Sequence, residues 1–215
     1  FELRSNQCFF RHAVHSGKIQ SNKNQKNQII LSVNSSADNE GLENLRPDSV
    51  CGKTLLIDVD SGEYEIFTSG HRNIIGLYSD ENIILATEHG PFAGDEINKI
   101  QQGLSYGWPV SSYGEKYSRG QSNEPPNYKK SHKKYGFEEP IFSFIPAIGI
   151  SEIIKLPNNF SEMWQDNFLI ASLNGKYLYR VKFDDDYKKV IYHERIFIGD
   201  RIRDIIYNDN SKEIY

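Results

Sequence analysis

The stretch "DENIILAT" (residues 80–87) holds the pattern that decides the fold: a polar turn followed directly by a strand of buried type. The pattern returns at three other places: "KNQIILSV" (26–33), "QDNFLIAS" (165–172) and "NSKEIY" (210–215). Successive aligned positions are separated by 54, 85 and 46 residues, counted between Ile29, Ile83, Phe168 and Ile214. A period of roughly 45–55 residues with about four short strands in each unit is typical of β-propeller blades.

Strand signals dominate the rest of the chain. Short runs rich in Ile, Val, Leu, Tyr and Phe lie between Asn, Asp, Gly and Pro, and predict strands at 28–33, 53–59, 63–70, 82–87, 167–173, 176–183 and 189–197. The best helical candidate is the short segment Asp95–Gly103. The sequence therefore predicts an all-β protein. A β-propeller fits the repeat, and a β-sandwich with irregular strand spacing is the alternative.

One separation is much longer than the others, and we expect a loop-rich insertion at about 107–140 to account for it. With that insertion, we expect residues 1–215 to form a single propeller domain, which the family resemblance given below implies to be partial. Asn174-Gly175 lies between two predicted strands and predicts a type I′ hairpin turn.

Composition excludes some classes of protein. The 215 residues are 38% hydrophobic, with no apolar run near the roughly 18 residues that a membrane-spanning helix needs. The net charge of -4 argues against nucleic acid as the main partner, and the lysines at 129, 130, 133 and 134 are interpreted as a solvated loop. Cys8 and Cys51 permit one disulfide without demonstrating it. No signal peptide is visible in the first residues.

Positive side chains recur where strands enter or leave the predicted central channel. Arg72 lies in "GHRNIIGL" (70–77), and Arg201 and Arg203 lie in "DRIRDIIY" (200–207). Guanidinium groups pair with carboxylates bidentately, so converging arginines suit a planar polyanion. The alternative is structural pairing of these arginines with nearby carboxylates, namely Asp95, Asp200 and Asp204.

Together these segments resemble one protein family. "GHRNIIGL", "EHGPFAGDEINKIQQGLSYGWP" (88–109), "ASLNGKYLYRV" (171–181) and "RIRDIIYNDNSKEIY" (201–215) are similar, in order and spacing, to signature segments of the glucose/sorbosone dehydrogenases. The resemblance covers residues 50–215 and extends more loosely from residue 15. It implies a six-bladed β-propeller quinoprotein that binds pyrroloquinoline quinone (PQQ). Family members are about twice as long, so we expect this chain to cover half to two-thirds of the ring.

The resemblance also implies a site. Arg72 and Asn73 would bind PQQ, together with Arg201 and Arg203, and Asn174 takes the position of a cofactor-contacting lysine. A calcium ion on the quinone would be held by the backbone carbonyls of Gly90 and Pro91. A second calcium would use Glu96 and Tyr106, which agrees with the preference of Ca²⁺ for oxygen ligands.

Four departures bear on catalysis. The family's general base is a histidine, and its register places Val14 at the expected position with His15 next to it; His12 is a second candidate. The strand "LSVNSS" offers Asn34-Ser35 where an orienting Asp is expected. Asn174 replaces the lysine, and Ala147 stands where Thr or Ser is expected. Two hypotheses therefore stay open: a quinoprotein sugar dehydrogenase with His15 as the base, and a catalytically degenerate, calcium-stabilised propeller that acts as a binding or interaction module.

The family also predicts the partners: a small-molecule sugar oxidised at its C1 hydroxyl and an external electron acceptor, with no nucleic acid and no membrane span. It predicts a periplasmic or secreted location. A further alternative is that an incomplete ring has no activity of its own. The tyrosines of the insertion could stack on a sugar ring or serve ordinary packing; they are Tyr113, Tyr117, Tyr128 and Tyr135.

Overall fold

The computed structural model describes residues 19–21, 28–35, 42–115 and 128–215. These residues form three four-stranded antiparallel sheets and one hairpin. The first sheet holds β1 (Ile19–Ser21), β2 (Gln28–Val33), β3 (Lys53–Asp58) and β4 (Tyr64–Thr68). The second holds β5 (Ile74–Ser79), β6 (Ile84–Glu88), β7 (Asp95–Lys99) and β8 (Phe142–Phe144). The third holds β9 (Ile150–Lys155), β10 (Asn167–Ser172), β11 (Tyr177–Phe183) and β12 (Val190–Phe197).

The hairpin that closes the chain consists of β13 (Tyr207–Asn208) and β14 (Glu213–Ile214). The described residues contain no α-helix; their helical elements are three short 3₁₀ turns: η1 (Leu42–Leu45), η2 (Lys133–Tyr135) and η3 (Glu162–Trp164). The prediction of an all-β protein is confirmed.

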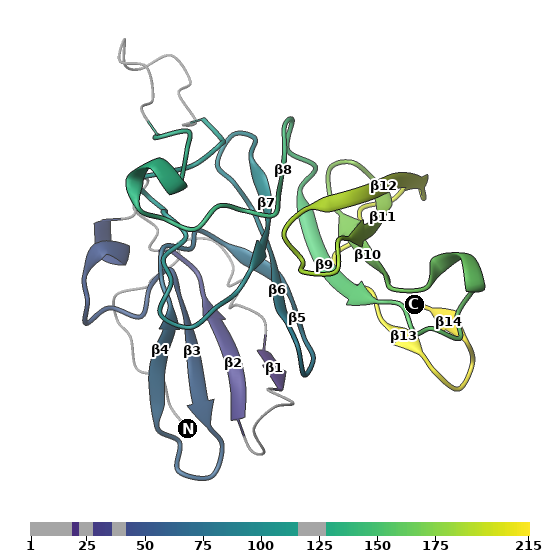
Figure 1. The fold of residues 1–215 in the computed structure, drawn as a ribbon, viewed down its shortest axis with the longest axis horizontal. Helices are drawn as coiled ribbons and strands as arrows, with labels where there is room; N and C mark the ends of the chain where they lie inside the picture. The colour runs from purple at the N-terminus through teal and green to yellow at the C-terminus, as the bar shows by residue number, and fades with distance from the viewer. Residues whose placement is uncertain (1–18, 22–27, 36–41, 116–127) are drawn as a thin grey trace.

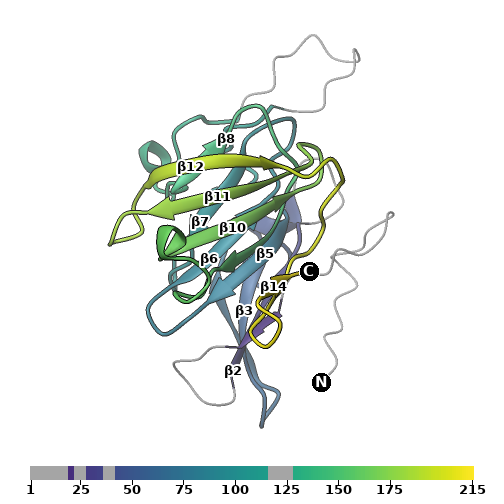
Figure 2. The ribbon, with the colours of Figure 1, turned by 90° about the vertical axis from the view of Figure 1, so that its right-hand side faces the viewer.

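The three sheets are successive blades of a β-propeller (Figure 1). Each is a meander in which the strands follow one another in chain order. The first strands of the blades face one another, because β5 packs against both β1 and β9. Figure 2 shows the third blade, β9 to β12, stacked over the second. The hairpin β13–β14 follows the third blade in the same sense around the ring.

The sequence repeat corresponds to the second strand of each unit. Ile29 lies in β2, Phe168 in β10 and Ile214 in β14, while Ile83 immediately precedes β6. The repeat is therefore real. It predicts that Ile83–Thr87 is the inner strand of its blade, and this prediction is wrong. The innermost strand of the second blade is β5, and β6 pairs with its outer side.

The predicted helix at Asp95–Gly103 is also wrong, since its first half is the strand β7. β7 lies between two partners: Ile97 is opposite Thr87 of β6 and Phe142 of β8. A strand paired on both sides satisfies its backbone within the sheet, and this tertiary pairing overrides the weak local helix signal. The predicted hairpin between β10 and β11 is confirmed, but its turn is not type I′, because Lys176, and neither Asn174 nor Gly175, has a positive φ (58°).

The largest apolar core lies between the second and third blades. Leu85, Ile97, Ile150, Phe168 and Ile170 are all nearly or fully inaccessible to solvent there. Burying each such side chain contributes about 1.5–3 kcal/mol, so this interface fixes the end of β6 relative to the start of β9. The site described below lies at that end of the blades.

The predicted insertion at 107–140 falls between β7 and β8, where the only helix or strand among the described residues is η2. The two described parts of this segment, 107–115 and 128–140, are hydrogen-bonded to each other. The Ser111 hydroxyl donates to the Lys129 carbonyl at 2.7 Å, and the Ser112 N–H donates to the same oxygen at 3.0 Å. The four lysines of the basic cluster are exposed to solvent. Cys51, in the turn before β3, is buried and disulfide-bonded, while Cys8 lies outside the described residues.

Candidate functional site

Two of the quoted sequence motifs meet in space. The "GHRN" segment (70–73) leads into β5 and the "EHGP" segment (88–91) leaves β6. β5 and β6 are antiparallel, with Ile74 opposite Glu88, so the two segments lie side by side. The N–H of His89 donates to the carbonyl of Asn73 at 2.9 Å and joins them directly.

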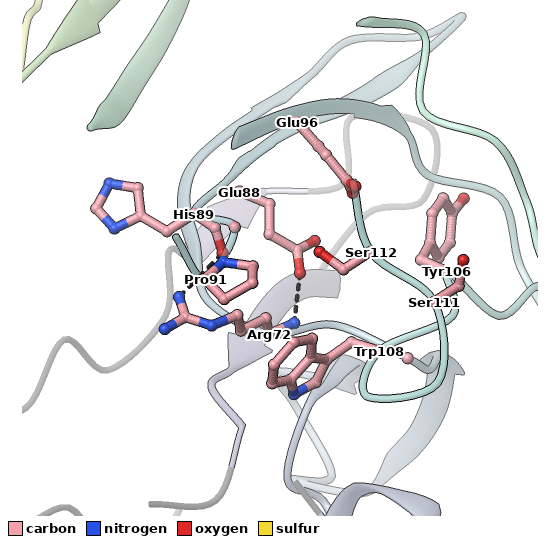
Figure 3. Close-up of a pocket in the computed structure, with 11 residues that line it drawn as sticks. Arg72, Glu88, His89, Pro91, Glu96, Tyr106, Trp108, Ser111 and Ser112 are labelled. Atoms are coloured by element: carbon pink, nitrogen blue, oxygen red, sulfur yellow. Dashed lines mark hydrogen bonds between the residues drawn. The ribbon is translucent and has the colours of Figure 1, made fainter. Parts of the chain in front are cut away.

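Glu88 lies at the centre of this junction. Its carboxylate is 4% exposed; one oxygen accepts the backbone N–H of Arg72, and the other lies 3.0 Å from Nδ1 of His71. Burial by itself would raise the pKa of Glu88, but the charge and hydrogen bond of His71 and the Arg72 N–H hold it below its usual value. Figure 3 shows Glu88 between Arg72 and Trp108 on one side and Glu96 on the other.

His71 is held on every side. Its ring contacts Thr68 through Nε2 (2.8 Å), and the ring face stacks on Tyr106 with centroids 4.6 Å apart. Its backbone N–H donates to the carbonyl of Gly52 at 2.9 Å, and its carbonyl accepts from the Asn44 amide at 2.9 Å. The residue before Arg72 is therefore fixed in position and in side-chain rotamer.

Arg72 is half-buried and presents its guanidinium beside the Gly-Pro step. Nη1 donates to the carbonyl of His89 at 3.1 Å, and the guanidinium lies 5.5 Å from the ring centroid of Trp108. Trp108 is itself fixed by a hydrogen bond from Nε1 to the hydroxyl of Ser35 at 3.0 Å. A guanidinium carries five N–H donors, and among the described residues the carbonyl of His89 is the one acceptor it uses.

The neighbouring Asn73 carries an amide oxygen that is buried and has no hydrogen-bond partner among the described residues. Buried polar atoms without a partner are uncommon, and each one calls for an explanation such as a bound ligand. Arg72 and Asn73 thus offer donor groups and an unsatisfied amide at the same end of β5.

The Gly90-Pro91 step has a backbone conformation that excludes larger residues. A Cβ atom at Gly90 would lie 2.2 Å from the carbonyl oxygen of Ala93 and 2.3 Å from that of Gly94. The Gly90 N–H donates to Oδ1 of Asp95 at 3.1 Å. No group among the described residues donates a hydrogen bond to the Gly90 carbonyl oxygen. This oxygen has the chemistry of a Ca²⁺ ligand.

Glu96 occupies the far side of a small pocket that is partly open to solvent. The pocket is lined by residues of both motifs and of the insertion: Gly70, Arg72, Glu88, His89, Gly90, Pro91, Glu96, Tyr106, Trp108, Ser111 and Ser112. Burial, reinforced by the nearby charge of Glu88, raises the pKa of Glu96 well above its usual range. The Asn98 amide lies 3.4 Å from Glu88 and 3.3 Å from Glu96 and bridges the two carboxylates.

His132, from the insertion, closes the back of this acidic group. Its ring is 1% exposed, with Nε2 3.9 Å from a Glu96 oxygen and Nδ1 3.9 Å from a Glu139 oxygen. Burial lowers the pKa of His132, with the charges of Glu139 and Glu88 acting against this effect. The part of the chain that the structure describes contains no group of three or more His, Cys, Asp or Glu arranged to hold a metal ion.

Comparison with known proteins agrees with this geometry. The sequence profile of the family described as Glucose / Sorbosone dehydrogenase matches residues 44–215. The chain belongs to the glucose/sorbosone dehydrogenase family. It is 32% identical over 145 residues to an aldose sugar dehydrogenase of Escherichia coli, a match that covers 66% of this chain and 38% of that protein.

Solved structures of family members share the fold. The apo-form of the E. coli soluble aldose sugar dehydrogenase superposes with a TM-score of 0.76 at 25% identity, covering 91% of this chain and 58% of that one. A PQQ-bound aldose sugar dehydrogenase of Streptomyces coelicolor gives 0.64 at 22% identity, covering 89% and 52%. The chain spans between 33% and 42% of the length of the curated relatives it matches.

The structure brings some of the residues expected from the family resemblance together and separates others. The pocket contains Arg72, Gly90, Pro91, Glu96 and Tyr106. The phenolic hydroxyl of Tyr106 does not face the pocket's carboxylates as a free ligand: it donates to the carbonyl of Lys99 and accepts the N–H of Gln101 at 3.0 Å.

The second group of expected cofactor residues is exposed. Asn174, Arg201 and Arg203 are on the surface of the third blade and the segment after it. Two hydrogen bonds attach that segment to the blade. The N–H of Ile202 donates to the carbonyl of Ser172, and the carbonyl of Ile202 accepts from the Ser151 hydroxyl at 2.7 Å. None of these three side chains lines the pocket. Among the described residues, no ion pair joins Arg72, Arg201 or Arg203 to Asp95 or Asp200.

Other sequence expectations have clear outcomes or lie outside the structure. His15, Val14, His12 and Tyr117 are outside the described residues. Ser35, where an orienting Asp is expected, is buried against Trp108. Tyr113 donates to Glu139 at 2.7 Å and Tyr128 packs on Trp108, so both serve packing, whereas Tyr135 is 42% exposed.

Sequence reasoning missed three residues of the site: His71, Glu88 and Trp108. All three lie inside the quoted motifs, but the family resemblance assigns roles to their neighbours and not to them. The available signal was a carboxylate at the end of an otherwise apolar strand, directly before His-Gly-Pro. Only the β5–β6 register shows that this carboxylate meets the "GHRN" segment.

No helix among the described residues has the length and apolar character to cross a membrane.

Proposed function

We propose that this chain is part of a quinoprotein that oxidises a sugar at its C1 hydroxyl, with PQQ as hydride acceptor and an external electron acceptor as its final partner. The observation that supports it best is the junction of the Arg72–Asn73 and Gly90–Pro91 segments. There the Arg72 guanidinium, with N–H donors to spare, lies next to Asn73, whose buried amide oxygen has no partner among the described residues. Donors and acceptors of this kind suit a planar ligand that carries several carboxylates and carbonyls.

The residues fit the cofactor on this chemistry. Arg72 and Asn73 would hold its polar edge, and the carbonyl oxygens of Gly90 and Pro91 would hold a Ca²⁺ ion. When bound, the calcium-loaded quinone supplies an electrophilic carbonyl that accepts a hydride. Arg201, Arg203 and Asn174 are proposed as further contacts from the neighbouring blade. Their exposed side chains leave them accessible to a ligand.

Residues of this chain would remove the proton of the substrate hydroxyl. His15 is proposed as the general base that takes the proton of the sugar C1 hydroxyl onto an imidazole nitrogen. Trp108, packed beside Arg72 and only 8% exposed, excludes water from one side of the junction. A sugar substrate and the family's proposed periplasmic or secreted location belong to the same proposal.

A second Ca²⁺ is proposed at Glu96 and Tyr106. Two buried carboxylates, Glu88 and Glu96, share one pocket, and a divalent cation would offset their repulsion. With the Tyr106 hydroxyl bonded to the backbone, its remaining oxygen donor is the carbonyl. Ca²⁺ binding would thus stabilise the loop between β6 and β7 and the start of the insertion.

The alternative is a calcium-stabilised propeller without catalysis. Two observations favour it: a neutral, exposed Asn174 replaces the expected lysine, and the Ser35 hydroxyl accepts a hydrogen bond from Trp108. The first proposal requires both cofactor binding and turnover, while the alternative requires calcium binding alone.

Titration with PQQ and Ca²⁺, followed by dye reduction with aldoses, separates the two. We expect quinone absorbance changes at micromolar PQQ and aldose-dependent dye reduction. Calcium-dependent thermal stability without PQQ binding would favour the binding module. Glu96→Gln should abolish the calcium effect on the unfolding temperature, whereas Glu162→Gln, at an exposed site, should leave it unchanged.

A further inference from the structure

Glu88 lies where its carboxylate contacts the backbone of Arg72 and the ring of His71. One carboxylate oxygen accepts the Arg72 N–H, and the other lies 3.0 Å from Nδ1 of His71. The same carboxylate thus contacts two consecutive residues of the "GHRN" segment from the end of a neighbouring strand. Displacing it would release both of them at once.

A hydrogen-bonded chain continues from this contact into the first blade. Nε2 of His71 lies 2.8 Å from the Thr68 hydroxyl, and the Thr68 hydroxyl contacts that of Thr54. All of these side chains are buried, with exposures between 0% and 4%. Glu88 therefore connects the site of the second blade to strands β3 and β4 of the first.

The rest of the Arg72 backbone is fixed from other directions. Its carbonyl accepts the N–H of Ser35 at 2.8 Å, and the next carbonyl, of Asn73, accepts from His89 at 2.9 Å. With the Glu88 contact, both sides of the Arg72 peptide are bonded. A site whose supporting groups are locked in this way holds its ligand-binding side chains within the narrow range that tight binding and catalysis need.

We propose that Glu88 and His71 form a positioning pair that sets the direction of Arg72 and Asn73 toward an anionic ligand. This inference rests on the proposed function for the identity of the ligand, PQQ. It does not rest on it for the positioning itself, which is a property of the protein alone. Glu88 and His71 act through Arg72, so neither is a catalytic residue.

The hydrogen-bond pattern predicts different behaviour for two substitutions. Glu88→Ala removes both acceptors and leaves two buried N–H groups unpaired. Glu88→Gln keeps an oxygen for the Arg72 N–H, and its amide can donate to Nδ1 of His71. For this contact the His71 ring must carry its proton on Nε2. That N–H can donate to the Thr68 hydroxyl, and the Thr68 hydroxyl can then donate to the Thr54 hydroxyl. The glutamine variant therefore preserves the contacts to Arg72 and His71 while it removes the charge, and it gives up only the 3.4 Å contact from the Asn98 amide.

The experiment measures PQQ affinity, thermal stability and amide hydrogen exchange on the same proteins in the presence of Ca²⁺. We expect Glu88→Ala to bind PQQ at least about tenfold more weakly than wild type, and Glu88→Gln to bind within about threefold of it. Ile57→Ala serves as the control, because Ile57 is buried in the core of the first blade, so its truncation destabilises the protein away from the pocket and from Arg201 and Arg203. It should lower the unfolding temperature but keep PQQ affinity.

Hydrogen exchange at the Arg72 amide tests the positioning without any ligand. We expect its exchange to be at least about tenfold faster in Glu88→Ala than in wild type, with unchanged exchange in β10 of the third blade. Equal exchange at Arg72 in the two proteins would overturn the inference. So would an Ile57→Ala variant that loses as much PQQ affinity as Glu88→Ala.

The two proposals fail in different ways. If wild-type protein binds no PQQ, the proposed function is overturned, and the exchange rate of Arg72 alone decides the positioning role. If wild type binds PQQ and Glu88→Ala binds it equally well, the proposed function stands and the positioning role is wrong.

Discussion

Asp95 joins the second blade to the third through Ile150: its Oδ2 accepts the Ile150 N–H, at the first residue of β9, at a distance of 3.0 Å. The same oxygen accepts the Ile148 N–H at 3.0 Å, while Oδ1 accepts the Gly90 N–H at 3.1 Å. One carboxylate, 2% exposed, thus positions the loop after β6 against the neighbouring blade.

Asp95→Ala should therefore be among the most destabilising single changes at this end of the molecule. It leaves three buried N–H groups without an acceptor, and we expect a loss of about 3 kcal/mol in the free energy of unfolding. Urea denaturation measures it. Asp209→Ala, at an exposed position, is the control and should change stability by less than about 0.5 kcal/mol. Equal losses for both would show that the Asp95 contacts carry no net stability.

Gly90→Ala should damage the loop more than an equivalent change at another glycine. A Cβ at Gly90 meets two backbone oxygens at 2.2 and 2.3 Å, and neither can move as a flexible side chain would. Gly103 is the comparison, because nothing lies within 4 Å of its Cβ position and only its φ of +80° opposes alanine. We expect about 1 kcal/mol for Gly103→Ala and a clearly larger loss for Gly90→Ala, measured by thermal unfolding. The reverse order would contradict the loop geometry.

Arg72→Lys tests the guanidinium against a simple positive charge. Lysine keeps the charge but lacks the planar fork that pairs with carboxylates and stacks on Trp108, so PQQ should bind about tenfold more weakly. Arg180→Lys is the matched control: Arg180 lies 4.6 Å from the ring of Trp164, an arginine–aromatic contact on the third blade outside the pocket. PQQ affinity should be unaffected by it. Equal affinities for wild type and Arg72→Lys would remove Arg72 from the cofactor site.

Asp80 makes stability depend on acid pH. It lies in the turn between β5 and β6; burial opposes its ionisation, but the N–H groups of Asn82 and Ile83 and the Tyr78 hydroxyl bond the carboxylate, so its pKa is lowered. The folded protein holds the ionised form better than the unfolded chain does. Its contribution is therefore complete above the unfolded pKa of about 3.9 and is lost as pH falls through the lower folded value.

Unfolding measured at several pH values between about 5 and 2 checks this, with Asp80→Asn as the comparison. Asparagine keeps an oxygen for the two turn N–H groups but does not titrate. The stability difference between wild type and Asp80→Asn should shrink as pH falls across this range. A difference that stays constant would mean that Asp80 has the same pKa in the folded and unfolded states.

The amino-acid sequence was sufficient to predict the fold class, the repeat and the family. The spacing of Ile83 and Phe168 reflects the strands β6 and β10, which are buried on both faces of their blades, and that burial leaves an apolar run in the sequence. The motifs around Arg72 and Gly90 are long and carry glycines that the backbone requires. Local chemistry of this kind is visible in one dimension.

What the sequence did not reveal were the innermost strands, β5 and β9, and the strand β7. β7 reads "DEINK" and carries a buried Asp, Glu and Asn, which local patterns assign to a helix or a loop. Those polar side chains are buried because Gly90, Ile148 and Ile150 supply donors for Asp95, and Asn98 bridges Glu88 and Glu96. The partners of Asp95 are between 5 and 55 residues away along the chain, and Glu88 lies on the neighbouring strand β6.

Tertiary structure alone decided which carboxylate does what. Glu88 and Glu96 end up in one pocket because β6 and β7 pair with these two residues directly opposite each other. Antiparallel register then sets Glu88 beside Ile74, which brings it to the "GHRN" segment. The sequence shows which residue types could bind a ligand, but the role of each residue depends on strand register. Register is fixed by the packing of the blades rather than by any local motif.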